Sequence, residues 1–309
     1  MFGLTRRQRI IFFPCLVVGV VLIAVTLASA PDQIAQVNPD ESPDRKLVRY
    51  SFTLVNQSDE AVENVIFRAF APVKDTHYQS VDLIQSSESF QLRRDALGNQ
   101  ELEYLIESLP PYGQKVITVS VELSVWNIPR NIKGEPFLSL LRQEGLVPLV
   151  DETHVGVESA LTEVRRLTIA DEPFAWMKAA NSWVYQSIDD VGYVSRDRGA
   201  LFALTERKGD CTEFMHALVA LARIQQIPSL PVAGFRIDGG GAILKAMDYH
   251  NWVMFEADGK WRVADPHADV FERQQDAYVV FRLLPANSGP GENSQRFFVH
   301  DPRVTVSMN

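Results

Sequence analysis

Alternating hydrophobic and polar positions mark the chain between residues 45 and 126. In KVITVSVELSV every second residue from Ile117 to Val125 is apolar, and LVRYSFTLVN has the same period around Tyr50 and Phe52. Turn-forming stretches such as NQSDE and LPPYGQ separate these runs. A period of two with turns at this spacing predicts a small antiparallel β-sandwich over residues 45–126. Since no polar cluster in this range suggests chemistry, we expect a spacer or docking domain.

Helical spacing replaces this alternation after residue 170. Apolar residues recur at helical intervals between Phe174 and Ile188, and the stretch GALFALTE indicates a shorter helix. A longer helix is predicted from Cys211 to Gln226, because it must end before Pro228. The stretches LPVAGFRI, NWVMFEA, KWRVAD and FFVHDPRVTV then favour strands. Helices followed by antiparallel strands predict an α+β domain over residues 127–309.

The first thirty residues have a third pattern. Three arginines between residues 6 and 9 precede an uncharged apolar run over residues 10–30, IIFFPCLVVGVVLIAVTLASA. Its length is close to the roughly 20 residues that a membrane-spanning helix needs. Because basic flanks stay on the cytoplasmic side, we expect residues 1–30 to cross the cell inner membrane once. The rest of the chain would then lie outside the cytoplasm, in the periplasm.

A cleaved signal peptide is the alternative to this uncleaved anchor. Ala28-Ser29-Ala30 resembles a cleavage site, although Pro31 would hinder processing. Residues 31–44 are proline-rich and acidic, which is typical of a linker, and we expect them to tether the folded domains to the membrane.

Charge and cysteine usage narrow the classes of function. The formal net charge is −9 and no basic stripe interleaved with aromatic residues occurs, so nucleic acid is not an expected partner. The chain has two cysteines, and Cys15 lies inside the apolar run, which leaves Cys211 as a lone thiol in an exported domain. Such a cysteine is either reactive or intermolecular. His77, His154 and His300 show no metal-ligand spacing, so neither a metal nor another cofactor is expected.

The residues around Cys211 predict a helix start. In ERKGDCTEF, Asp210 is a good N-cap residue and Glu213 follows three positions later, as in a capping box. Cys211 is then the first helical residue, and the positive end of the helix dipole stabilises a thiolate there. The neighbouring Asp210 carboxylate opposes this effect unless capping takes up its charge.

A base and an orienting carboxylate for such a thiolate are available downstream. The stretch YHNWVMFEADGKWRVADPH contains Asp258-Gly259, a strong signal for a two-residue hairpin turn. This turn places Asp265 opposite Trp252 and diagonal to His250, within reach of a hydrogen bond between the histidine and the carboxylate. We expect this face of the hairpin to pack against the helix that carries Cys211; its apolar members are Trp252, Met254, Trp261 and Val263.

These blocks together resemble the catalytic core of the transglutaminase-like superfamily over about residues 170–270. The resemblance rests on RGALFALTERKGDCTEFMHALVALARIQQIPSLPVAGFRI, then YHNWVMF, then VADPH, in the order of the family. It implies a papain-like fold with Cys211 as nucleophile, His250 as general base and acid, and Asp265 as orienting carboxylate. A preceding β-sandwich is common in this family. The third block often is Asp-Pro-Thr, whereas here His267 follows Pro266; we expect His267 and Trp252 to contribute to substrate binding.

The resemblance implies acyl transfer from an amide through a thioester. Hydrolysis of a peptide or amide is favoured, because water is abundant outside the membrane. Transfer to an amine, which would cross-link substrates, is the alternative, and a non-catalytic peptide-binding module on the same fold is a third possibility. The expected substrate is a protein, a cell-wall peptide or a small amide.

Overall fold

The structure, a computed structural model, describes residues 42–130, 132, 135–168, 172–285 and 295–309. All of them belong to one compact unit, Asn38–Asn309. The predicted membrane anchor and most of the predicted linker lie outside the described residues. Within the described ranges, no helix has both the length and the apolar character needed to cross a membrane.

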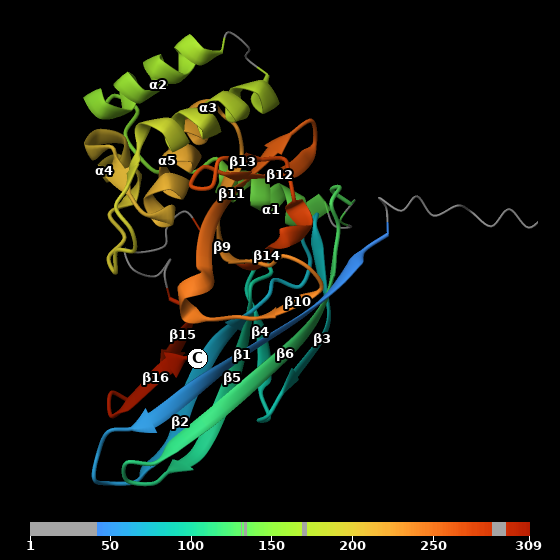
Figure 1. Cartoon of the computed structure of the whole chain (residues 1–309), viewed down its shortest axis with the longest axis vertical. Coiled ribbons are helices and arrows are strands. Elements are labelled where there is room, and N and C mark those ends of the chain that lie inside the picture. Colours follow the sequence, from blue (N-terminus) through green and yellow to red (C-terminus); the bar gives the residue numbers. More distant parts are fainter. Residues whose placement is uncertain (1–41, 131, 133–134, 169–171, 286–294) are drawn as a thin grey trace, which may run out of the picture. The chain divides into compact units, whose positions relative to one another are not determined.

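Two sheets form the β-sandwich (Figure 1). The first has the order β10-β1-β6-β3, with β16 also paired to β1; its members are β1 (Asp44–Asn56), β3 (Gln79–Ser86), β6 (Gln114–Val125), β10 (Gly241–Ile243) and β16 (Val304–Met308). The second has the order β15-β2-β5-β4, with β2 (Val62–Ala71), β4 (Gln91–Arg94), β5 (Gln100–Leu109) and β15 (Phe297–Val299). The apolar residues of the alternating runs are buried between the sheets, as predicted, for example Tyr50, Phe52, Ile117 and Val119.

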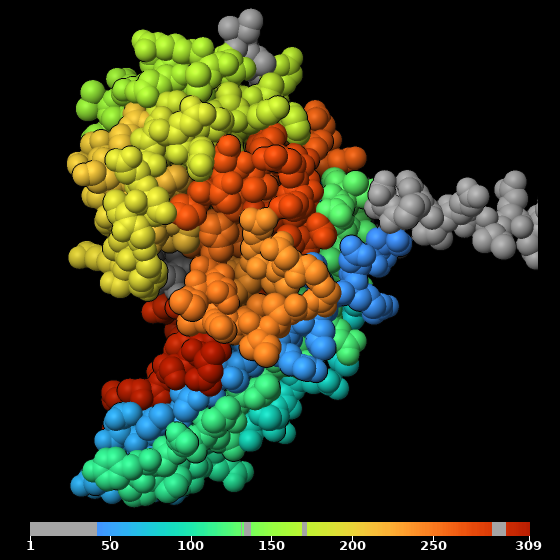
Figure 2. All heavy atoms as spheres, in the orientation of Figure 1, coloured from blue at the N-terminus to red at the C-terminus, as the bar shows by residue number. Residues whose placement is uncertain are grey.

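Strands from late in the chain complete both sheets. β10 pairs in parallel with β1, β16 pairs with β1, and β15 pairs with β2. Figure 2 shows the red C-terminal segment lying against the blue N-terminal strand. Gly241 permits the close approach of β10, because a Cβ atom there would meet the carbonyl oxygen of Leu47. All three strands lie within the range predicted for the second domain, so the two regions are interwoven; the predicted boundary at residue 126 stays a prediction.

The second region packs most of its helices against one face of a five-stranded sheet and its first helix, α1, against the other face. Its helices are α1 (Glu135–Gly145), α2 (Val155–Leu167), α3 (Pro173–Ser187), α4 (Gly199–Glu206) and α5 (Cys211–Ile224). The sheet has the order β13-β12-β11-β9-β14, with β9 (Ser229–Arg236), β11 (Tyr249–Ala257), β12 (Lys260–Asp265), β13 (Val270–Phe271) and β14 (Tyr278–Leu283). Short elements join them: β7 (Asp189–Asp190), β8 (Lys208–Gly209), and the 3-10 turns η2 (Ala246–Asp248) and η3 (Gln275–Ala277). This mixture of helices and mainly antiparallel strands agrees with the predicted fold class.

The helix α2 was not predicted from the sequence. Its N-cap is His154, whose ring accepts a hydrogen bond from the backbone of Gly156 at 3.2 Å. Histidine is not among the residues that usually mark a helix start, so the sequence carried no start signal here. The buried residues of α2 do recur at helical spacing: Val157, Ala160, Leu161 and Val164.

The β11–β12 hairpin has the predicted register but presents the opposite face to α5. Ala257 pairs with Lys260 and Val253 with Ala264, as the Asp258-Gly259 turn required. The residues that share a core with α5 are Val253, Phe255, Ala257 and Ala264. The face expected there, with Trp252, Met254, Trp261 and Val263, packs instead with Leu141 of α1 and with β9 and β14. Because both faces of this sheet are covered, both are apolar, and alternation could not distinguish them.

Candidate active site

Helix α5 begins with the predicted capping box. Asp210 accepts a hydrogen bond from the backbone N–H of Thr212 at 2.9 Å, and Glu213 accepts one from the backbone N–H of Asp210 at 3.0 Å. The second Asp210 oxygen accepts from the backbone of Val194 at 2.9 Å. Both oxygens of this carboxylate therefore accept backbone hydrogen bonds, one from the helix start and one from the loop before α4. The free thiol of Cys211 sits half-buried at the positive end of the helix.

Glu213 fixes this helix start to the preceding loop. Its carboxylate is 1% exposed and accepts from the Arg198 backbone at 2.8 Å and from Nη2 of Arg198 at 2.9 Å. The hydrogen bond and charge of Glu213 also raise the pKa of Arg198, against the effect of its burial. Glu213 is thus a buried anion with a complete set of partners, and it ties Asp210, Arg198 and the first turn of α5 together.

We expect Glu213→Ala to lower the free energy of unfolding by about 3 kcal/mol, because breaking a buried ion pair leaves its partner uncompensated. Urea or thermal unfolding followed by circular dichroism measures this loss. The matched control is Glu158→Ala, an exposed acidic residue in the first turn of α2, for which we expect a change below about 0.5 kcal/mol. Equal effects for the two variants would show that the buried network does not stabilise the helix start.

The structure brings the two other predicted residues into direct contact. His250, at the start of β11, and Asp265, at the end of β12, are joined by a hydrogen bond of 2.7 Å between Nε2 and Oδ2. Asp265 is fully buried and also accepts from the backbone N–H groups of His267 and Ala268, both at 3.2 Å. Burial alone would raise the pKa of Asp265, but the hydrogen bond and charge of His250 hold it below its ordinary value. Asp265 is therefore ionised.

His250 is held in its protonated form. Burial lowers the pKa of its ring, but hydrogen bonds with Asp265 and Cys211, and the charges of both groups, raise it from 6.5 to about 10. Since Nε2 contacts Asp265, Nδ1 is the ring nitrogen left to exchange a proton with the sulfur. An imidazolium between a carboxylate and a thiol is the arrangement that activates cysteine nucleophiles.

Asn251 was not predicted as a site residue, yet it contacts the sulfur. Its Oδ1 accepts from Sγ of Cys211 at 3.6 Å and from the hydroxyl of Thr212 at 3.2 Å, while Nδ2 donates to the Val232 carbonyl at 3.3 Å. This side chain links the start of α5 to β9 and orients the thiol while it carries its proton. In the sequence, Asn251 is marked as a site residue by nothing except its place next to His250, and its side chain lies on the other face of β11.

Tyr278 is a second site residue that was not predicted from the sequence. It lies at the start of β14, and its hydroxyl donates to Asp265 Oδ2 at 2.9 Å. Burial and the Asp265 charge raise the pKa of this phenol well above its ordinary value, so it stays a neutral donor. Long-range strand pairing brings Tyr278 here, and no local pattern indicates its role.

We expect Tyr278→Phe to destabilise the protein by about 1–3 kcal/mol, since it removes one donor from a buried carboxylate. Turnover should fall several-fold, because Asp265 then holds the His250 ring less firmly. Unfolding curves and rates measured on the same preparation test both effects. Tyr185→Phe is the matched control, because this tyrosine is 47% exposed on α3 and should change neither quantity. An unchanged unfolding free energy for Tyr278→Phe would contradict the importance of this bond.

The two residues predicted to bind substrate lie beside the imidazole of His250. Trp252 is fully buried, with its ring centroid 6.2 Å from that of His250 at an interplanar angle of 27°. The ring centroid of His267 is 5.7 Å from that of His250, and its Nε2 is 3.3 Å from Asp190. Neither residue lines the pocket beside Cys211. Both positions suit packing against the ring of His250; a substrate contact by either residue stays a prediction.

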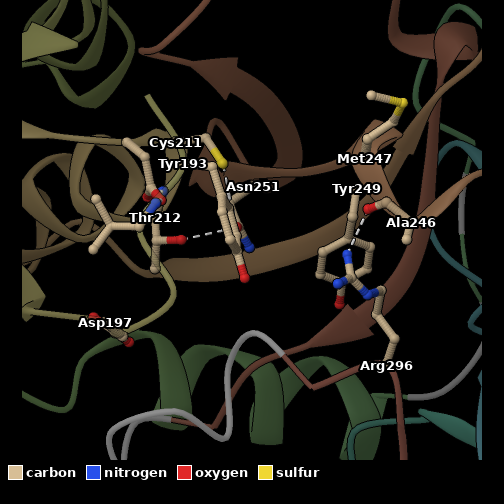
Figure 3. Close-up of a pocket in the computed structure, with 11 residues that line it drawn as sticks. Tyr193, Asp197, Cys211, Thr212, Ala246, Met247, Tyr249, Asn251 and Arg296 are labelled. Atoms are coloured by element: carbon tan, nitrogen blue, oxygen red, sulfur yellow. Dashed lines mark hydrogen bonds between the residues drawn. The ribbon is translucent and has the colours of Figure 1, made fainter. Parts of the chain in front are cut away.

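A pocket of about 360 Å³ opens beside Cys211 (Figure 3). One wall comes from the start of α5 and the loop before α4, and the other from η2, the start of β11 and Arg296. Tyr193 and Met247 are 78% and 84% exposed. The full lining is Tyr193, Val194, Asp197, Asp210, Cys211, Thr212, Ala246, Met247, Tyr249, Asn251 and Arg296. Its size falls in the range of small-molecule and peptide side-chain sites.

Comparison with known proteins shows what the part of the chain with Cys211, His250 and Asp265 is similar to. Residues 164–266 match the model of the transglutaminase-like superfamily, a range that contains Cys211, His250 and Asp265. A solved structure of a proposed cysteine protease from Cytophaga hutchinsonii aligns with a TM-score of 0.58 and 13% identity, over 87% of this chain and 89% of that one. The periplasmic domain of TgpA from Pseudomonas aeruginosa aligns with a TM-score of 0.39 and 15% identity, over 74% of this chain and 88% of that one. No curated protein matches. The first alignment shows a shared fold.

Proposed function

Because residues 164–266 match the transglutaminase-like superfamily, we propose that the protein is a cysteine-dependent amide hydrolase. The observation that carries the proposal is the contact between His250 and Asp265, 2.7 Å long, beside a free thiol at a helix start. In this proposal Cys211 is the nucleophile, His250 the general acid and base, and Asp265 the group that orients the imidazole. A binding module would need none of these three to be arranged in this way.

The proposed reaction proceeds in two steps. The Cys211 thiolate attacks the amide carbonyl carbon, a C–S bond forms, and the developing oxyanion lies near the backbone N–H of Cys211 in the first helical turn. The C–N bond then breaks as His250 gives its proton to the departing amine, which leaves a thioester. In the second step water loses a proton to His250 and attacks the thioester, so that a C–O bond forms and the C–S bond breaks. Breaking the C–S bond releases the Cys211 thiolate beside the protonated His250, which restores the starting state.

Mass spectrometry of peptide mixtures tests the proposal. The soluble part of the chain is incubated with glutamine- and asparagine-containing peptides, with and without methylamine, and Cys211→Ala serves as the blank. We expect products in which water has replaced an amine at an amide bond. Products that carry methylamine in place of the original amine would identify a transamidase instead. If neither product exceeds the blank, the enzyme proposal fails and a binding module becomes the better account.

We also propose that residues 10–30 anchor the protein in the inner membrane and place this domain in the periplasm. The support is the apolar run behind three arginines and the single thiol in the remainder of the chain. Fusing alkaline phosphatase to the C-terminus tests the orientation, because this reporter is active only after export. An inactive fusion present at normal level would contradict the proposal.

A further inference from the structure

A cation faces Cys211 across the pocket. Arg296 lies immediately before β15, and its backbone carbonyl accepts from the N–H of Phe70 in β2 at 3.1 Å. The sandwich therefore fixes the position of this arginine. Figure 3 shows Cys211 and Arg296 on opposite sides of the pocket, with Asn251 and Tyr249 between them.

The guanidinium of Arg296 is held in place but keeps unused donors. Nη1 donates to the Ala246 carbonyl at 2.6 Å, and the guanidinium carbon lies 5.0 Å from the ring centroid of Tyr249. Within the described residues Arg296 makes no ion pair and no second side-chain hydrogen bond. A guanidinium has five N–H donors, so most of its capacity is available. Burial raises the pKa of Tyr249 to about 12, so this phenol supplies no countercharge.

The carboxylates of the pocket are already engaged elsewhere. Asp210 caps α5 and binds the backbone of Val194. Asp197 accepts from the backbone of Gly199 at 2.8 Å, and its Oδ1 lies 3.4 Å from Nδ1 of His216. Arg296 is therefore a fixed cation in a pocket whose anions have other partners. Arginine in this setting suits planar, bidentate recognition of a carboxylate.

We propose that Arg296 binds a carboxylate of the acyl-donor substrate, so that the preferred substrates are peptide amides with an anionic group close to the bond that Cys211 attacks. This inference rests on the proposed function of Cys211. The carboxylate can belong to an acidic side chain or to a free C-terminus, since both present the same two oxygens. The β-sandwich would thus contribute to substrate specificity, because strand β2 holds Arg296, the residue that binds the carboxylate.

Paired alkylating reagents test the proposal without a known substrate. The thiolate displaces iodide from an iodoacetyl group, and a C–S bond forms. One pair is N-iodoacetylglycine and its amide, which differ in a terminal carboxylate. The second pair is N-iodoacetyl-glutamic acid α-amide and N-iodoacetyl-glutaminamide, which differ in a side-chain carboxylate. For each pair the second-order rate constant at Cys211 gives an acid-to-amide ratio, and iodoacetamide gives the basal reactivity of the thiol.

We expect at least one acid-to-amide ratio to fall by about tenfold in Arg296→Gln, the effect of one charge-assisted hydrogen bond. The pair that responds identifies the source of the carboxylate. The matched control is Arg93→Gln, which removes an exposed arginine of β4 that pairs with Glu103. It should leave both ratios unchanged. Arg296→Lys keeps the positive charge but loses the planar pair of guanidinium donors, so we expect an intermediate acid-to-amide ratio. If thermal melting shows that Arg296→Gln is unfolded, the ratio of Arg296→Lys becomes the test.

The alkylation rates distinguish an error in the role of Arg296 from an error in the proposed function of Cys211. If iodoacetamide labels Cys211 rapidly but Arg296→Gln and Arg296→Lys both keep the wild-type acid-to-amide ratios, the inference is wrong. The role of Arg296 would then be limited to its contacts with Ala246 and Tyr249. If iodoacetamide labels Cys211 no faster than free cysteine in the wild-type protein, the proposed function fails and the inference fails with it.

Discussion

Replacing Cys211 with alanine is expected to reduce turnover of peptide amides by at least about 10³-fold, to the level of the blank. No other described side chain contains a thiol, and a thioester cannot form without it. The fold should persist, because the side chain is half-buried and its hydrogen bond to Asn251 is long, at 3.6 Å. Product formation by mass spectrometry and melting by circular dichroism measure the two effects.

The matched control for this variant is Cys15→Ala, which changes the other cysteine of the chain. It should turn over substrate at the wild-type rate when the full chain is assayed. Turnover by a correctly folded Cys211→Ala protein would contradict the assignment of the nucleophile. A large loss of stability in the same variant would mean that the thiol has a structural role that its contacts do not indicate.

The second large effect is expected for Asp265→Asn, which should lower kcat by about 10³–10⁴-fold, as removal of the orienting carboxylate does in catalytic triads. In the wild-type protein the pKa of His250 is about 10, raised from 6.5, so kcat/KM should decline above about pH 10 as the general acid loses its proton. Removal of the Asp265 charge and hydrogen bond should move this decline to lower pH. A pH–rate profile from pH 5 to 11 measures the shift.

The raised pKa of His250 also implies that the free energy of unfolding depends on pH. Because the folded protein holds this proton more tightly than the unfolded chain, the stabilisation is complete below about pH 6.5 and is lost as the pH rises through about 10. This dependence should weaken in Asp265→Asn. Asp258→Asn, in the exposed turn of the same hairpin, is the matched control and should retain the wild-type profile. An alkaline decline at the same pH in wild type and Asp265→Asn would show that Asp265 does not set the ionisation of His250.

Local patterns predicted the parts of the site that lie close together in sequence. The capping box at Asp210 and Glu213 follows from residue types three positions apart, and the hairpin register follows from the turn at Asp258-Gly259. Cys211 and His250, by contrast, lie far apart along the chain; the hairpin packing that was expected to join them involved the wrong face, and the family resemblance carried the connection. Strand alternation similarly predicted β1 and β6 of the sandwich.

Features that depend on long-range packing could not be read from the sequence. Tyr278 reaches Asp265 because β14 pairs with β9, and Arg296 enters the pocket because β15 pairs with β2. The choice of which hairpin face contacts α5 was predicted wrongly, since Trp252 and Phe255 are equally apolar on opposite faces. In each case the deciding contact joins residues whose local surroundings resemble ordinary strands.

Activation of Cys211 by His250 and Asp265 can be measured as the alkylation rate of Cys211 by iodoacetamide at pH 6. Free cysteine has a pKa of about 8.5, so less than about 1% of it is thiolate at this pH. We expect Cys211 to react roughly 100-fold faster than glutathione, and His250→Ala to remove this advantage. A wild-type rate equal to that of glutathione, or a rate unchanged in folded His250→Ala, would contradict the activation of Cys211 by His250.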